Sequence, residues 1–209
     1  MKNKEKILLS ATRLFNEMGV VNVRLQHISD DTIISLGNIA YHFKNKEAIV
    51  STIFEAMEKK LKEALIEYRH TPIFANMDRI FASVEEVQTD YRFFFSDLIE
   101  IKRNYPGLFE KIFQFFTWQE FFFQEIILFN ISRGAFKPIQ DETEKAFLAT
   151  FLVQSINRYP ATHLLWAGNT TDKSDLSFYI WQILLPFMTQ TGREEIDVLI
   201  NQKVRISNS

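Results

Sequence analysis

The sequence contains no cysteine, so it has no disulfide framework, no thiolate metal site and no cysteine nucleophile. Glycine and proline are also scarce, at 6 and 5 of 209 residues, which excludes collagen-like and low-complexity chains. Long apolar runs are missing too: the nearest candidate, residues 112–131, carries five Gln and Glu side chains, too many for a membrane-spanning helix. The N-terminus lacks the apolar stretch of a secretory signal, and we expect a cytoplasmic protein with no membrane partner.

What the sequence has in excess is phenylalanine, with 21 residues against 6 Tyr and 3 Trp. Only three of them lie in residues 1–70, and the other 18 follow. Charge divides in the same way, because the net charge of −2 averages a first part of +2 and a remainder of −4. These two compositions predict two functional parts that meet near Pro72.

Apolar residues recur at helical spacing almost throughout, and alternating strand patterns are absent, so we expect an all-α fold. A long first helix ends before Gly19. Two short helices follow at 25–31 and 35–42, with Ser35 as N-cap of the second, and Asn45 caps the next long helix. Later helices are expected at 73–87, 90–103, 106–132, 141–167, 173–190 and 193–203.

The two short helices, joined by a tight turn at 32–34, have the form of a helix-turn-helix, whose second helix lies in the DNA major groove. Asn38 on that helix suits bidentate contact with adenine, and Gln26 on the preceding helix can do similar work. Several neighbouring side chains suit phosphate contacts. These are Ser35, Tyr41, His42, Lys44 and Lys46.

Two segments carry a definite resemblance: ILLSATRLFNEMG at 7–19 and ISLGNIAYHFKNKEAI at 34–49. They are similar to the TetR family of bacterial transcriptional regulators, over about residues 5–60. Beyond those residues only the helical layout and the length resemble the family. The matching positions of the second segment are Ser35, Gly37, His42, Phe43 and Lys46.

The resemblance implies three regions: a helix-turn-helix DNA-binding domain at 1–48, a connecting helix at 49–70, and a helical ligand-binding and dimerisation domain at 71–209. It implies a homodimer on double-stranded DNA, with base contacts from Asn38 and Gln26 and phosphate contacts from His42 and Lys46. We therefore expect a ligand-responsive regulator, a repressor, bound to a pseudo-palindromic operator. The expected DNA-binding residues are Arg24, Gln26, Ser35, Leu36, Gly37, Asn38, Tyr41, His42, Lys44 and Lys46.

Some positions depart from the family pattern. Ala40 stands where the family usually has a DNA-contacting Tyr. Ile33 stands where the turn usually has Gly, and a β-branched residue disfavours positive φ. Asp30 and Asp31 dilute the positive field. These departures motivate an alternative, a helical small-molecule-binding protein whose DNA-binding head is weakened or lost.

The Phe-rich helix at 106–132 is apolar on most sides, which predicts burial in the middle of the C-terminal part. Family members keep their ligand pocket there, and apolar pockets with a few polar groups are the usual small-molecule sites. The wall chemistry favours a small apolar or aromatic effector with little charge, although a Phe stripe is more often plain core. The candidate ligand-binding residues are Tyr91, Phe94, Gln114, Phe115, Trp118, Phe122, Asn157, His163 and Trp166.

The last two long helices each carry an apolar stripe, and the resemblance implies that they form a four-helix dimer interface with a second copy. The alternative is an intramolecular core. The candidate interface residues are Phe147, Phe151, Ser155, Tyr159, Leu176, Tyr179, Ile180, Ile183 and Phe187.

Enzyme chemistry finds no support in the sequence. The four His, at 27, 42, 70 and 163, are scattered and lack metal-ligand spacing. A phosphate-binding Gly loop and a G-x-S-x-G elbow are both absent. We expect no enzyme, no metal and no cofactor.

Overall fold

The computed structural model describes residues 2–67, 70–166 and 175–207, except for the side chains of 164, 166 and 202–207. Within these ranges it contains helices and no strand, apart from one isolated bridge between Phe136 and Met188. The chain forms two compact units. The head unit comprises residues 1–61 and 87–114, and the body unit comprises residues 62–86 and 115–209.

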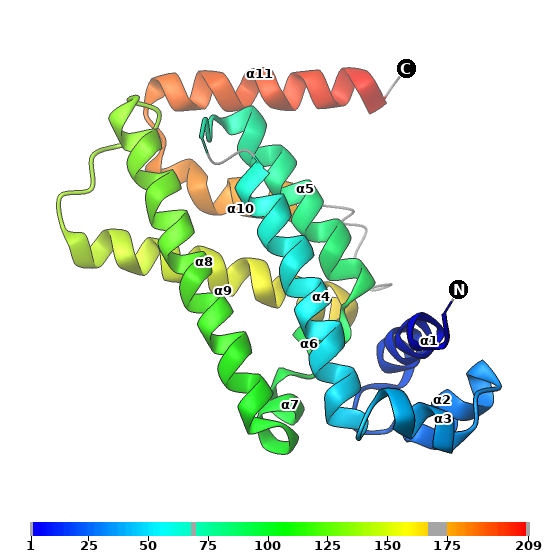
Figure 1. Cartoon of the computed structure of the whole chain (residues 1–209). Coiled ribbons are helices and arrows are strands. Elements are labelled where there is room, and N and C mark those ends of the chain that lie inside the picture. Colours follow the sequence, from blue (N-terminus) through cyan, green and yellow to red (C-terminus); the bar gives the residue numbers. More distant parts are fainter. Residues whose placement is uncertain (1, 68–69, 167–174, 208–209) are drawn as a thin grey trace. The chain divides into compact units, whose positions relative to one another are not determined.

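The helices confirm the all-α prediction (Figure 1). The head unit holds α1 (Asn3–Met18), α2 (Leu25–Thr32), α3 (Leu36–His42), α6 (Phe93–Ser96) and α7 (Leu98–Asn104). The body unit holds α9 (Glu142–Trp166), α10 (Leu176–Leu184), the short 3-10 helix η1 (Leu185–Phe187) and α11 (Gln190–Ser207). Three helices, α4 (Lys46–Glu67), α5 (Phe74–Asp90) and α8 (Pro106–Ser132), contribute to both units.

Two predicted helices are divided. The helix expected at 90–103 is two short ones, since Asp97 leaves the helical conformation between α6 and α7. The helix expected at 173–190 ends at Leu184 and passes into η1, where Pro186 has no N–H to continue an α-helical ladder. The caps follow the predictions more closely: Gly19 ends α1 with φ 80°, and Ser35 and Asn45 accept backbone N–H groups at the starts of α3 and α4.

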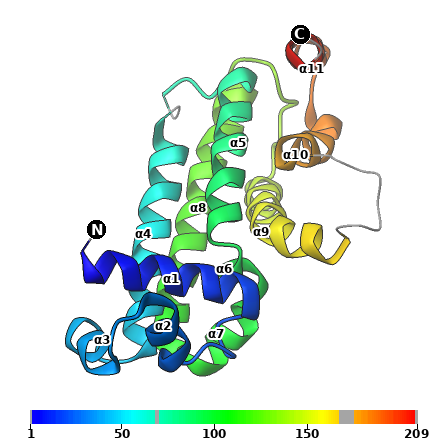
Figure 2. The same ribbon diagram turned by 90° about the vertical axis from the view of Figure 1, so that its right-hand side faces the viewer.

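The predicted boundaries near residues 48 and 70 do not coincide with the division between the units, because α6 and α7 pack within the head. The rings of Phe15 and Phe93 lie 5.2 Å apart, and those of Phe54 and Phe94 lie 5.7 Å apart. The Asp97 carboxylate also accepts the Val20 N–H at 2.8 Å. Figure 2 shows α1 beside α6 and above α2 and α3. Part of the Phe-rich sequence is therefore the core of the head.

The body unit has its own core, in which a buried carboxylate joins α5 to α10. Asp78 accepts hydrogen bonds from the Ser177 hydroxyl and, at 3.0 Å, from the Trp181 indole N–H. The Trp181 ring also packs between Phe74 and Phe81, with centroids 4.9 and 5.6 Å away. Aromatic packing and a satisfied polar group together fix the position of α10 in this unit.

Candidate nucleic-acid interface and ligand groove

The turn between α2 and α3 has the tight form that a helix-turn-helix needs. Ile33 adopts the left-handed conformation, with φ 57° and ψ 31°, and its side chain is 93% exposed. The Ser29 hydroxyl donates to the Ile34 carbonyl at 2.7 Å, and the Ser35 hydroxyl accepts the Asn38 N–H at 3.3 Å. Serine hydrogen bonds thus hold the turn on both sides of a conformationally unfavourable isoleucine.

Replacing Ile33 by glycine is expected to stabilise the head. The left-handed conformation costs a non-glycine residue roughly 1–2 kcal/mol, and the exposed side chain makes little packing to lose. The greater freedom of glycine in the unfolded chain offsets part of this gain, which leaves about 0.5–1 kcal/mol. Urea unfolding followed by far-UV circular dichroism measures the change. Ile33→Ala keeps a Cβ and should gain less; a midpoint lowered by Ile33→Gly contradicts the strain assigned to this turn.

One face of α3 has no role in the core of the head. Ile39 and Phe43 are buried, whereas Leu36 and Tyr41 are 44% and 85% exposed. Gly37 is exposed too, and a Cβ built on it meets no atom within 4 Å. Glycine inside a helix costs about 1 kcal/mol relative to alanine, and nothing within the described chain requires it here. The predicted reading residues of α3 therefore form an outward surface that a nucleic-acid backbone can approach closely.

The ammonium group of Lys46, expected to contact phosphate, lies instead among backbone carbonyls of the loop between α1 and α2. It donates to the carbonyls of Val20, Val21 and Val23 at 2.8, 3.4 and 2.9 Å. Burial lowers the pKa of Lys46. An ammonium has three donors, so this arrangement leaves none for phosphate. Lys46 ties the start of α4 to that loop.

The acidic residues of α2 are engaged in local hydrogen bonds. Asp31 accepts from the Ser10 hydroxyl at 2.6 Å and from the Arg13 guanidinium, and these bonds lower the pKa of Asp31. Asp30 accepts the Gln26 side-chain amide at 2.6 Å. The Gln26 side chain therefore already has a hydrogen-bond partner, and it must give up that bond to contact a base edge. Arg24 and Lys44 are exposed cations of the same unit.

A groove in the body unit combines aromatic walls with a few polar groups, as small-molecule sites do. It has a volume of about 490 Å³ and lies along one face of α8, beside the end of α4 and the segment before α5. Trp118, Phe121, Phe122 and Phe129 form its aromatic side. Ile66, Pro72 and Ile126 add aliphatic surface, and Glu125 and His70 are its polar groups.

The predicted ligand-binding residues do not form one site. Trp118 and Phe122 line the groove, and Phe115 stacks on Trp118 at 5.9 Å. Tyr91, Phe94 and Gln114 belong to the head unit. Asn157 is buried and donates to Gln119 at 2.8 Å, His163 is exposed beside Tyr159, and the Trp166 side chain lies outside the described residues.

Sequence reasoning missed Phe121, Glu125 and Phe129 as groove residues. The available signal was the spacing 118, 121, 122, 125 and 129, which places residues at i+3, i+4, i+7 and i+11 on one helical face.

The predicted dimer residues divide by burial. Phe147, Phe151 and Tyr179 are 69%, 44% and 42% exposed, which suits a contact surface. Leu176, Ile180 and Ser155 are buried within the chain itself, so their side chains pack in the body unit, and their place at an interface stays a prediction. Helical spacing cannot tell which of two apolar faces turns toward the core. The remaining three, Tyr159, Ile183 and Phe187, are half-buried, and Phe178, which was not among the predicted residues, is exposed.

In the described part of the chain, no cluster of three or more His, Asp or Glu side chains has the geometry to hold a metal ion. The same residues include no helix with the length and hydropathy needed to cross a membrane.

Comparison with known proteins decides the family. A family model described as TetR, bacterial transcriptional repressor, matches residues 55–196, about two thirds of the sequence. The chain belongs to the TetR family. This regulator therefore has the family's fold, with an N-terminal helix-turn-helix head and a helical C-terminal body, and that family and fold are those of transcriptional regulators.

Relatives of this TetR-family regulator support the assignment. The HTH-type transcriptional regulator AcrR of Shigella flexneri is 34% identical over 68 residues, which span 32% of each chain, about a third of that relative's length. A TetR-family regulator from Marinobacter aquaeolei VT8 is 29% identical, with TM-score 0.83 over 97% of this chain and 98% of that one. The ketosteroid regulator KstR2 of Mycobacterium tuberculosis shares the fold at 15% identity, with TM-score 0.68 over 90% and 96%.

Proposed function

We propose that this TetR-family regulator is a homodimeric repressor that binds a pseudo-palindromic operator and leaves it when a small aromatic effector binds the body. It acts in the cytoplasm, where the chromosome lies. The observation that carries the proposal is the outward face of α3. It presents Leu36, Gly37, Asn38 and Tyr41 while Ile39 holds the helix in the head.

Dimerisation is supported by apolar side chains left exposed on α9 and α10. Phe147 and Phe151 stack on one another with centroids 6.4 Å apart, and both are exposed. Phe178 and Tyr179 are exposed on α10. Exposed apolar patches mark interaction sites, and we assign these four side chains to one. A two-fold dimer places two copies of α3 about 34–36 Å apart, the spacing of successive major grooves.

The DNA contacts are tested by comparing two neighbouring lysines. Lys44→Ala removes an exposed cation, so we expect weaker binding to all duplexes and a salt-dependence slope reduced by about 1. Lys46→Ala removes a loop tie and no phosphate contact. We expect it to weaken DNA binding and lower the melting temperature of the head while leaving the salt slope unchanged. Fluorescence anisotropy with labelled duplex at several salt concentrations measures affinity and slope.

Asn38→Ala is the matched test of base reading. It should bring specific and scrambled duplexes about 1–3 kcal/mol closer in affinity and leave the salt slope unchanged. If Lys46→Ala reduces the slope as Lys44→Ala does, then Lys46 leaves its carbonyls to bind phosphate. If Asn38→Ala keeps the full preference, then α3 does not read the sequence as proposed.

A further inference from the structure

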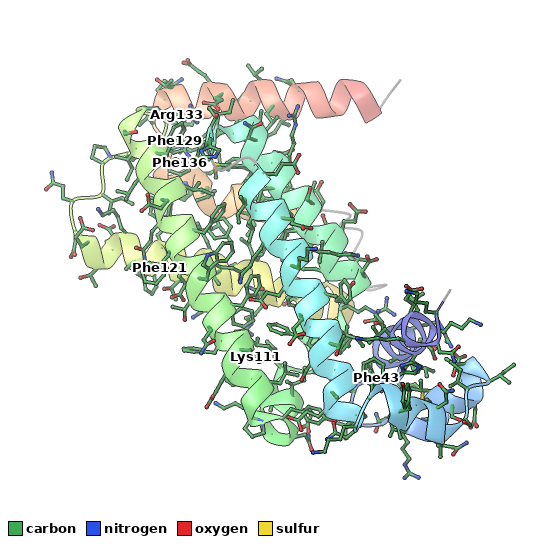
Figure 3. All side chains as sticks on the ribbon, viewed as in Figure 1. Phe43, Lys111, Phe121, Phe129, Arg133 and Phe136 are labelled. Atoms are coloured by element: carbon green, nitrogen blue, oxygen red, sulfur yellow. The ribbon has the colours of Figure 1, made fainter. Side chains whose placement is uncertain are left out.

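The aromatic side of the groove continues a stacked row of rings along α8. Phe115 and Trp118 stack with centroids 5.9 Å apart and 15° between their planes. Trp118 and Phe122 stack at 5.7 Å and 24°. Figure 3 labels Phe121 and Phe129 at successive positions along the same helix. The faces of such rings carry partial negative charge, so the row attracts cations as well as apolar groups.

The chain already places one cation on this row. The Lys62 ammonium lies 5.5 Å from the centroid of Trp118 and 5.9 Å from that of Phe115. Cation–π attraction acts within about 6 Å of a ring centroid, so both contacts qualify. Lys62 therefore covers the end of the row that Phe115 and Trp118 form.

At the other end lies a carboxylate. Glu125 stands three residues after Phe122 and four before Phe129, so it shares their helical face. Glu125 is exposed and lines the groove. Within the portion of the chain that the structure describes, no Lys, Arg or His lies within ion-pair distance of it. Among the described residues, the Glu125 carboxylate therefore stands beside aromatic rings without an ion-pair partner.

We infer that the groove binds a small aromatic organic cation, with its ring against Trp118 and Phe122 and its positive group near Glu125. A neutral ligand gains only the apolar contacts, whereas a cation also gains the ring faces and the carboxylate. Quaternary ammonium groups suit such sites because they are recognised by aromatic rings. A volume of about 490 Å³ lies within the range of small-molecule sites.

This inference deepens the effector part of the proposed function and replaces the apolar or aromatic effector with little charge that the sequence predicts. The role of the cation as an effector rests on the proposed function, whereas its binding to the groove does not. Binding itself is measured without DNA, so failure here and failure of operator binding give separate results.

The test uses two isosteric probes, (4-hydroxyphenyl)trimethylammonium and neutral 4-tert-butylphenol, with the full chain. Each probe has one nine-proton methyl resonance in its proton NMR spectrum, so the same signal reports both titrations. We expect the cation to bind at least about tenfold more tightly than the phenol, with an upfield methyl shift from the ring faces. Equal affinities, or binding of the phenol alone, would overturn the inference.

Variants locate the site. Glu125→Gln should weaken the cation about tenfold and leave the phenol unchanged, whereas Glu120→Gln, on the same helix but outside the groove lining, should change neither. Phe121→Leu alters a side chain that is 64% exposed, so it should fold, and it should weaken both probes. Equal weakening by the two Glu variants would mean that only the overall negative field attracts the cation. Cation affinity that falls as protein concentration rises would mean that a second copy covers the groove; either result overturns the proposal.

Discussion

Gly192→Ala is expected to destabilise the body unit by about 3 kcal/mol, although alanine is normally the better helix residue. A Cβ at this position would lie 2.2 Å from the Ala135 carbonyl oxygen and 3.3 Å from Met188 Cβ. That carbonyl accepts the Thr189 N–H at 3.0 Å, and the Ala135 N–H bonds to the Asn130 carbonyl at 2.9 Å. Because the obstacle is backbone held on both sides, relief requires the start of α11 to move.

The measurement is urea unfolding followed by tryptophan fluorescence. All three tryptophans, at 118, 166 and 181, belong to the body unit, so the signal reports that unit alone. Gly134→Ala is the matched control, since it has φ 77° but no atom within 4 Å of its added Cβ. It should cost about 1 kcal/mol from backbone strain. Equal losses in the two variants would contradict the close approach assigned to Gly192.

Glu195→Ala is expected to cost about 2–3 kcal/mol, because this carboxylate joins three elements of the body unit. It accepts two bonds from the Arg133 guanidinium, at 2.5 and 3.1 Å, and the Phe74 N–H at 2.9 Å. Arg133 also lies over the Phe74 ring at 4.8 Å, near the junction of α8 and α11 (Figure 3). Removing Glu195 leaves the Phe74 N–H without this acceptor and the partly buried Arg133 without its counter-charge, although Arg133 keeps its bond to Asn130 at 2.7 Å.

The adjacent glutamate supplies the control. Glu194 is exposed and only accepts the Gln190 side chain within one helical turn, so Glu194→Ala should stay within about 0.5 kcal/mol of the parent. Glu195→Gln retains an acceptor and should lose about 1 kcal/mol. The same fluorescence-detected unfolding measures all three. If Glu195→Ala unfolds at the same midpoint as Glu194→Ala, then the three-way contact contributes nothing to stability.

The predictions that succeeded were local ones. The helix at 106–132 has the predicted bounds, and Gly19, Ser35 and Asn45 end or begin helices as their side chains and backbone preferences require. These features depend on a few neighbouring residues, so a single sequence contains them.

The sequence alone does not predict which surfaces meet in the folded chain. Phe93 and Phe94 pack in the head, and Leu176 and Ile180 face the core of the body. An apolar stripe predicts that a helix is buried on one side, but it does not identify the surface against which that side packs. Lys46 satisfies a motif for phosphate contact, yet its ammonium reaches three loop carbonyls. These carbonyls are 23 to 26 residues from Lys46 in the sequence, and tertiary packing brings them to its ammonium group.

The central claim, that α3 and its neighbours read DNA, is tested most directly by equilibrium binding to the duplex upstream of the chain's own gene. A scrambled duplex of equal composition is the reference, and both are titrated between about 50 and 200 mM salt. The account predicts tighter binding to the upstream duplex, two chains per site, and affinity that falls steeply and log-linearly with salt. Equal affinity for both duplexes at the lowest salt would contradict it and favour a small-molecule-binding protein whose head no longer reads DNA.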